Sequence, residues 1–271
     1  VFMNLTEDIH PVFKTGEIDD LLNRLMRGDL IFFDAHGNTA DHDRSLHVKR
    51  VIFEPYSGYP RQPVCGVLNT FDRLAITAYD VSPIELKGAR VRSAPFFDYL
   101  LYACGGCTRG VKTYDDAVSW LARVVQKCDR SGVVVYIQSQ GNKEMRYVNT
   151  LWSKLQHILG TVVCGALCRD SCNRICRHEM EGKILVRINN TEGHITDDDV
   201  DALRKLAGSA HDRNEWSANV LVIAQNVPPP HEGAIVINNK LDDAQRPQHS
   251  DLKKVNPCDV AKVLYSHDLV M

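Results

Sequence analysis

The sequence predicts an α/β fold with a largely parallel central sheet flanked by helices. Short apolar runs have the length of buried strands, and segments whose apolar residues recur at helical spacing lie between several of them. A strand, a helix and a second strand in succession form a βαβ unit, which requires parallel strands. The predicted strands are residues 30–33, 48–53, 74–79, 96–104, 133–137, 184–188, 219–224 and 234–237.

The predicted helices fill most of the space between these strands. Residues 115–128 place apolar side chains three and four positions apart, and Asp115 or Thr113 is suited to cap this helix. Residues 196–206 open with three aspartates, which favour the first turn of a helix. Three further helical segments are predicted over residues 18–26, 145–177 and 258–265, and residues 242–257 are predicted to be rich in loops.

The composition is that of a globular protein. The chain has 271 residues, of which 44% are hydrophobic and 24% charged. This length suits one large domain or two small ones. We expect a catalytic α/β core over residues 1–150, followed by a helical segment with additional strands over residues 151–271, which either completes that core or forms a second domain.

Charge and cysteine content narrow the class of protein. The net charge of −2 disfavours a nucleic-acid partner or a membrane surface, because neither is attracted by a field of this sign. No apolar run reaches the length of about 18 residues that a membrane-spanning helix needs. Nine cysteines are an odd number, which favours reduced thiols in a cytoplasmic, reducing compartment.

Two polar residues follow predicted strands and stand beside glycine. His36 comes after the apolar run 30–33, and Cys104 comes after the apolar run that begins at residue 96. The carboxyl ends of parallel strands share one edge of a sheet, where open α/β sheets place their sites. An imidazole and a thiol at that edge form a base and a nucleophile. The backbone amides after Cys104, beginning with Gly105, are placed to bind a developing oxyanion.

These two segments resemble the caspase-like (clan CD) cysteine peptidases, which include caspases, CHAT-domain peptidases and the cysteine peptidase domains of bacterial toxins. The matching segments are Phe33-Asp34-Ala35-His36-Gly37 and Leu101-Tyr102-Ala103-Cys104-Gly105-Gly106. The resemblance covers roughly residues 28–142. Tyr102 stands where caspases have glutamine, and no caspase specificity pocket can be carried over.

The resemblance implies a caspase-like fold and a thiol protease that cleaves a protein or peptide substrate without a cofactor. Cys104 would attack the peptide carbonyl while His36 relays the proton, and the amide of Gly37 would help to stabilise the oxyanion. Ser139 and Gln140 follow the 133–137 strand and would line the substrate cleft.

Three alternatives stay open. The chain is a non-enzymatic interaction or structural domain of a larger protein if its histidine and cysteine only pack. It is a metal-binding protein if the cysteines that recur every four residues from Cys164 bind an ion, with Cys164, Cys168 and His178 as the ligands. Residues 34–38 also resemble the manganese-binding stretch of the arginase-like ureohydrolases, with Asn38 in place of a carboxylate ligand.

Overall fold

A parallel sheet of five strands organises the larger part of the chain. The strand order is β4-β5-β6-β3-β7, and all four neighbouring pairs are parallel. β3 is therefore interior, between β6 and β7, although it comes first in sequence. The strands span Val134–Gln138 (β3), Cys164–Arg169 (β4), Leu185–Asn190 (β5), Asn219–Ala224 (β6) and Ala234–Asn238 (β7).

The computed structural model divides the chain into two units, residues 1–72 and residues 73–271. In the first unit β1 (Arg50–Ile52) pairs in parallel with β2 (Val67–Asn69). The sheet of five strands and the helices belong to the second unit. The structure describes residues 50–52, 67–69, 74–76, 86–106, 110–128, 131–139, 141–170, 172, 175, 177–180, 182–190, 193–208, 218–238 and 247–268.

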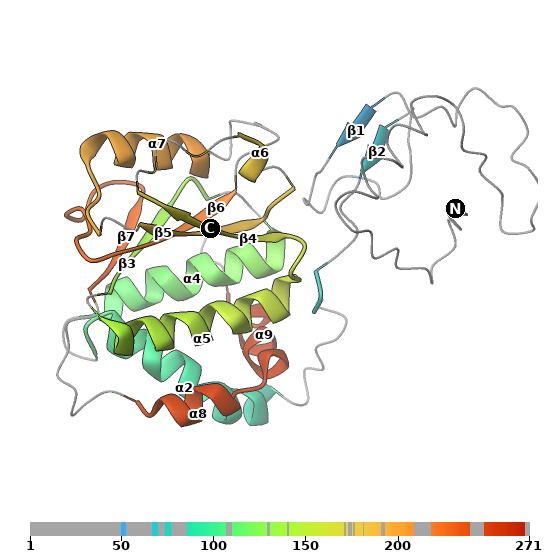
Figure 1. Cartoon of the computed structure of the whole chain (residues 1–271). Helices are drawn as coiled ribbons and strands as arrows, with labels where there is room; N and C mark the ends of the chain where they lie inside the picture. Colours follow the sequence, from blue (N-terminus) through green and yellow to red (C-terminus); the bar gives the residue numbers. More distant parts are fainter. Residues whose placement is uncertain are drawn as a thin grey trace, which may run out of the picture. The chain divides into compact units, whose positions relative to one another are not determined.

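Helices cover both faces of this sheet (Figure 1). α6 and α7 lie on one face, α4 and α5 lie on the other, and α2, α8 and α9 form a further layer against α4 and α5. The helices span Leu86–Ala103 (α2), Val111–Lys127 (α4), Asn142–Leu159 (α5), Arg177–Met180 (α6), Asp197–Ala207 (α7), His249–Lys254 (α8) and Pro257–Tyr265 (α9). None of the helices in the described part of the chain has the length and apolarity needed to span a membrane.

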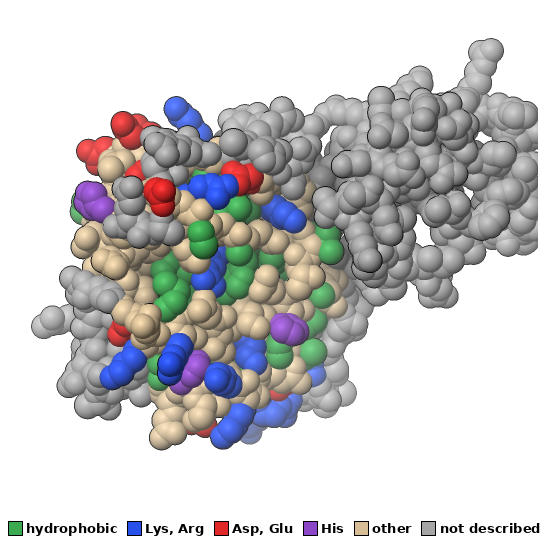
Figure 2. Space-filling view, viewed as in Figure 1, with side chains coloured by type: hydrophobic (Ala, Val, Ile, Leu, Met, Phe, Trp, Pro, Cys, Tyr) green, Lys and Arg blue, Asp and Glu red, His purple; other side chains and the backbone are tan. Residues whose placement is uncertain are grey.

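Charge is distributed unevenly over this unit. Figure 2 shows Asp and Glu side chains gathered over α7, and Lys, Arg and His side chains gathered over α5 and α8. The first turn of α7 holds three aspartates, whereas the last turn of α8 holds Lys253 and Lys254. The small net charge of the whole chain therefore conceals an acidic region over α7 and a basic region over α5 and α8.

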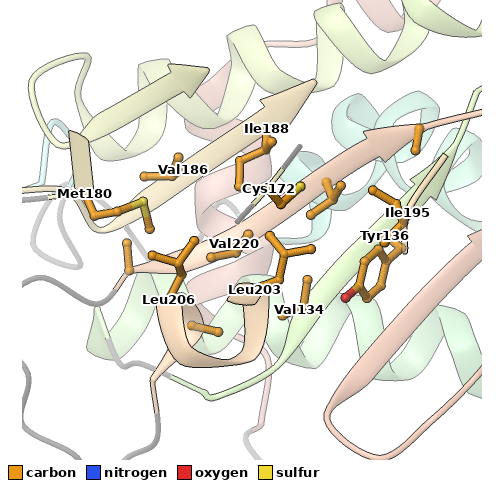
Figure 3. Close-up of a cluster of buried hydrophobic side chains, with 14 residues drawn as sticks. Val134, Tyr136, Cys172, Met180, Val186, Ile188, Ile195, Leu203, Leu206 and Val220 are labelled. Carbon is orange, nitrogen blue, oxygen red and sulfur yellow. The ribbon is translucent and has the colours of Figure 1, made fainter. Parts of the chain in front are cut away.

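The core on the α7 face is built from alternate residues of the central strands (Figure 3). Val134 and Tyr136 of β3 pack there with Leu203 and Leu206 of α7, and each of these side chains is buried. Strand side chains alternate between faces, so the same strands send their other residues to the α5 face. There Val135 and Ile137 face the apolar sides of α4 and α5 across a small internal cavity. Nearly every residue of β3 and β6 is buried, as expected for interior strands of a parallel sheet.

The sequence prediction of this architecture is confirmed. The fold is α/β with a parallel sheet flanked by helices. The strands predicted over residues 133–137, 184–188, 219–224 and 234–237 correspond to β3, β5, β6 and β7. The predicted helices over residues 115–128, 196–206 and 258–265 correspond to α4, α7 and α9. α7 starts with a capping box, in which the Thr196 hydroxyl accepts from the Asp199 amide and the Asp199 carboxylate accepts from the Thr196 amide.

The predicted strand over residues 96–104 is wrong, because this segment is the second half of helix α2 and the turn after it. Its buried residues include Phe96, Tyr99, Leu100 and Ala103, which are spaced three and four apart as on one face of a helix. A short apolar run fits a buried strand and a buried helix equally well. Two helices, α2 and α4, therefore precede β3, and the βαβ unit predicted at this point does not exist.

Three more segments differ from their predictions. Residues 164–169 form strand β4 and not part of a long helix, because the helix predicted over 145–177 ends at Leu159. Residues 74–76 carry no strand, and the predicted loop over 242–257 contains α8. The expected division of the chain between residues 150 and 151 stays a prediction; the two compact units comprise residues 1–72 and residues 73–271.

Candidate functional site

The carboxyl ends of β3 and β6 are joined by hydrogen bonds that continue beyond the strands. The Ser139 amide donates to the Ala224 carbonyl at 2.9 Å, and the Gln138 side-chain amide donates to the Gln225 carbonyl at 2.7 Å. These bonds hold the first residues after β3 against the first residues after β6. The turn that leaves β3 is thereby anchored at the edge of the sheet.

This turn leads directly into the amino terminus of α5, a helix of 18 residues. Gly141 is the N-cap, with an extended backbone at φ −170°, and as a glycine it has no side chain of its own with which to cap the helix. The amides of a first helical turn have no acceptor within the helix, and together with the helix dipole they attract anions. The sequence after β3 thus places a helix amino terminus with a glycine N-cap beside an interior strand.

Ser139 lies in this turn, and the environment of its side-chain hydroxyl is unusual. The residue is 5% exposed, and its Oγ has no hydrogen-bond partner among the residues that the structure describes. A buried hydroxyl without a partner costs free energy, on the order of 1–3 kcal/mol. Ligands with acceptor or donor oxygens offset such a cost when they bind beside it, so the hydroxyl marks the turn as a place for a polar ligand.

Two charged residues lie at the start of α5. Lys143 is the second helical residue and is exposed, and Glu144 is the third and partly exposed. A Cβ atom placed on Gly141 would lie 3.1 Å from Oε2 of Glu144, so this carboxylate reaches back over the turn. The lysine adds positive charge to the helix terminus, and the glutamate opposes it.

Amide side chains follow the neighbouring strands. At the end of β5, Asn190 accepts from the His194 amide at 3.1 Å and donates to the Asp170 carbonyl at 3.2 Å. After β6, the backbone N–H of Asn226 donates to the Gly193 carbonyl at 2.7 Å. Gly193 has φ +74°, and a Cβ atom there would come within 3.1 Å of the Gln225 side chain, so glycine allows this close approach.

The other asparagine at the end of β5, Asn189, forms hydrogen bonds with side chains of β5 and β4. Asn189 accepts from Nε of Arg187 at 2.9 Å and donates to the Cys168 sulfur at 3.7 Å. The Arg187 guanidinium lies 5.9 Å from the centre of the Trp152 ring, on the α5 face. Burial lowers the pKa of Arg187, and the neighbouring Cys168 raises it to a smaller extent. Of the two asparagines, Asn190 is the one that borders the turns at the sheet edge.

Cys104 lies after a helix and not after a strand. It follows the last residue of α2, and its amide donates to the Leu100 carbonyl at 3.0 Å. Burial raises the pKa of its thiol to about 12, which opposes formation of the thiolate that a nucleophile needs. The Gly105 amide donates to the Tyr102 carbonyl at 3.1 Å, so a bond within the turn already uses it.

Three other residues of the predicted peptidase site lie outside the described part of the chain. This holds for His36, Gly37 and Gln140, so the proposed pairing of His36 with Cys104 stays a prediction. Ser139 is described, but it comes from the turn after β3, whereas Cys104 comes from the turn after α2. The structural reason given for bringing the two segments together, a shared strand edge, does not apply to Cys104.

The cysteine stripe is also placed differently from the prediction. Cys164 and Cys168 lie on β4, where four residues span about 13 Å, too far for both sulfurs to bind one ion. Burial raises the pKa of Cys164 to about 12. His178 falls in α6, and its side chain is outside the described set. Within the described residues, no three His, Cys, Asp or Glu side chains form a group that would hold a metal ion.

Sequence reasoning selected Ser139 as part of a peptidase cleft, and it missed Lys143, Asn190 and Asn226. The available signal was a glycine and a lysine, Gly141 and Lys143, standing directly after a buried strand and at the start of a helical pattern. Such a strand–turn–helix order is the structural context of phosphate-binding loops.

No protein-family model and no curated protein matches the sequence. Among solved structures, the chain is similar to the C-terminal region of NrS-1 in its apo form. An apo structure of residues 305–718 has a TM-score of 0.52 and 14% identity, covering 81% of this chain and 55% of that one. Two A-form apo structures have TM-scores of 0.50, with 16% and 14% identity. The chain thus spans about half of the NrS-1 region, and at this identity the similarity concerns the α/β fold alone.

Proposed function

We propose that the unit formed by residues 73–271 binds a phosphate-bearing small molecule, a nucleotide, where β3 turns into α5. The observation that carries this proposal is the position of the amino terminus of α5, with glycine as its N-cap, directly after an interior parallel strand and with Lys143 in its first turn. Backbone amides, helix dipole and lysine together suit a phosphate group. The unpartnered hydroxyl of Ser139 in the same turn supports a polar occupant.

The topology of the sheet supports the same location. α5 leaves β3 along one face, whereas the connection after β6 packs Val227 against the core on the α7 face. β3 and β6 are neighbouring strands. The chain therefore leaves two adjacent strands toward opposite faces of the sheet. Open α/β sheets bind ligands in the crevice at such a switch point.

The turn departs from the full phosphate-loop motif, and the departures limit the proposal to binding. Asn142 precedes Lys143 where that motif has glycine, and Glu144 follows it where the motif has the magnesium-binding serine or threonine. β5 ends in two asparagines, whose neutral amides are weaker partners for a divalent cation than carboxylates. We therefore assign no phosphoryl-transfer step to these residues.

The described cysteines support the compartment expected from the sequence. Six cysteines are described, and all six are free thiols. We propose that the protein works in a reducing compartment such as the cytoplasm, where thiols of this kind persist.

The test is direct binding of ATP to the full chain, measured by calorimetry with and without magnesium. We expect the Lys143→Ala variant to lose about tenfold or more in affinity, since hydrogen bonds to charged groups contribute about 1.5–3 kcal/mol. The matched control is Lys112→Ala, an exposed lysine in the first turn of α4. The proposal is overturned if ATP, ADP and GTP all fail to bind at millimolar concentration, or if both variants behave alike.

A further inference from the structure

Basic side chains lie along α5 and α8, on a surface that we name the basic ridge. On α5, Arg146, Lys154 and His157 follow one another at intervals of eight and three residues, which places them on one side of the helix. On α8 the ridge continues through Lys253 and Lys254. Figure 2 shows these side-chain types gathered on this face of the molecule.

Direct contacts hold the two helices of the ridge together. Oγ1 of Thr150 lies 2.9 Å from Nε2 of His249, and the Lys154 ammonium donates to the Lys253 carbonyl at 2.8 Å. The Tyr147 hydroxyl donates to the Pro247 carbonyl at 2.8 Å, just before α8. The positive charges on α8 are therefore fixed in position relative to those on α5.

Positive charge on the ridge exceeds negative charge. The sequences of α5 and α8 together hold five Lys or Arg residues and two acidic residues, Glu144 and Asp251. The Asp251 carboxylate lies 3.4 Å from the Lys254 ammonium. Burial lowers the pKa of His249, and the positive charge of Lys253 lowers it further. A hydrogen bond with the Arg146 backbone raises this pKa and opposes the smaller lowering by the Arg146 charge. The cations thus repel one another, and an anionic partner laid along the ridge would relieve that repulsion.

We propose that the basic ridge binds the sugar–phosphate backbone of a nucleic acid without reading its sequence. From Arg146 to His157 the ridge extends about 16 Å along α5, the axial length of about five base pairs of B-form duplex. Lys and Arg side chains on an exposed helix face are the usual partners of phosphate oxygens.

Other features of the ridge favour this partner over a membrane or a peptide. The exposed large hydrophobic residues in the described part of the chain are Val91, Val111 and Val162, and none belongs to α5 or α8. Insertion into a bilayer needs such residues. The larger of the two described cavities is lined by α4 and the strand edge, away from the ridge. Tyr147 stacks on Tyr99 at 4.6 Å, so its ring is not a free platform for bases.

The experiment measures fluorescence anisotropy of a labelled 20-base-pair duplex and a labelled 20-nucleotide single strand with the full chain, across a salt series. The Lys253→Glu variant reverses one ridge charge, and Lys205→Glu makes the same change on exposed α7, on the other face of the sheet. We expect Lys253→Glu to weaken binding at least tenfold and to reduce the salt slope by about one. Lys205→Glu should change affinity less than twofold.

Three results would overturn the proposal: no binding of either probe at low salt, equal effects of the two variants, or binding to phosphatidylserine vesicles with none to nucleic acid. The proposal goes beyond nucleotide binding and fails separately from it. Lys253→Glu should leave ATP affinity unchanged, because Lys253 lies outside the turn after β3. If ATP does not bind but Lys253→Glu still weakens the nucleic-acid complex, the proposed function fails and the ridge stands.

Discussion

Arg92 on α2 holds Asp259 on α9 through two parallel hydrogen bonds, 2.9 Å from Nε to Oδ2 and 2.7 Å from Nη2 to Oδ1. The Asp259 side chain is 7% exposed, whereas the Arg92 side chain is 55% exposed. The pair joins two helices that lie far apart in sequence and pack together in the outer layer. Because one partner is buried and the other is not, the two have unequal roles in stability.

We expect Arg92→Ala to lower the free energy of unfolding by about 1–2 kcal/mol. Charge-assisted hydrogen bonds contribute about 1.5–3 kcal/mol, and the exposure of Arg92 reduces that value. Urea unfolding followed by circular dichroism measures the change. Arg92→Lys keeps the charge but loses the paired geometry, so its loss should be smaller. A loss below about 0.5 kcal/mol for Arg92→Ala would show that the pair is only a surface contact.

The same pair predicts how stability depends on pH. Hydrogen bonds from Arg92 hold the pKa of Asp259 below its ordinary value of 3.8, against the opposing effect of burial, and Lys262 adds to the lowering. The unfolded chain therefore takes up the proton first as pH falls. The contribution of the pair is complete above the ordinary value and is lost as pH falls through the lower folded value. The stability difference between wild type and Arg92→Ala should shrink when unfolding is measured below about pH 4.

Tyr136 offers a test of an unpartnered buried hydroxyl. The residue is fully buried on β3, its hydroxyl has no hydrogen-bond partner within the described part of the chain, and burial is the main cause that raises its pKa. Tyr136→Phe should leave the free energy of unfolding unchanged or raise it by up to about 1 kcal/mol. The matched variant is Tyr265→Phe, which removes a hydroxyl that donates to the Ile76 carbonyl at 2.8 Å and should cost about 1 kcal/mol. If Tyr136→Phe is the more harmful of the two, its hydroxyl has a bound partner in solution.

The extent to which the sequence predicts this fold depends on how each segment is buried in it. The segments that became β3 and β6 were predicted because interior parallel strands need continuous apolar residues, and no helical spacing competes within five or six residues. The prediction of a strand before Cys104 was wrong for the opposite reason. Aromatic and leucine side chains suit a strand locally, and only packing of α2 against α9 shows that they form one side of a helix.

The candidate site was predictable in part. Ser139 was selected because the resemblance to caspase-like peptidases implies a substrate cleft after that strand. The residue does follow β3, and its role in a peptidase cleft stays a prediction. Asn190 and Asn226 gave no signal, because the sheet order brings β5, β6 and β3 together only after long-range pairing. No local pattern in the sequence contains that order, since β3 is the first of the five strands along the chain and lies between the last two, β6 and β7.

Thiol reactivity tests the peptidase prediction directly. With a pKa raised to about 12, Cys104 should react slowly with iodoacetamide at neutral pH, because the thiolate is the reactive form. The exposed thiols of Cys168 and Cys258 should be labelled first, as peptide mass spectrometry after short exposures will show. Cys128, whose pKa burial also raises to about 12, is the slow reference. Labelling of Cys104 before all others, lost in His36→Ala, would instead support the dyad.

Glu144 provides the sharpest test of the proposed nucleotide site, because its carboxylate reaches back over Gly141. A phosphate bound at the amino terminus of α5 would meet this negative charge at close range. Glu144→Gln keeps the size of the side chain and removes the charge, so we expect ATP to bind about three- to tenfold more tightly, a gain of roughly 1 kcal/mol.

The same substitution should slightly destabilise α5, since a negative charge in the first turn contributes about 0.3–1 kcal/mol to a helix. Asp116→Asn is the matched control, because it neutralises an exposed acidic residue on α4, outside the turn after β3. Calorimetric titration with ATP separates the cases. Tighter binding in Glu144→Gln alone places the phosphate at the turn, whereas an unchanged or weaker affinity in that variant would place the nucleotide elsewhere.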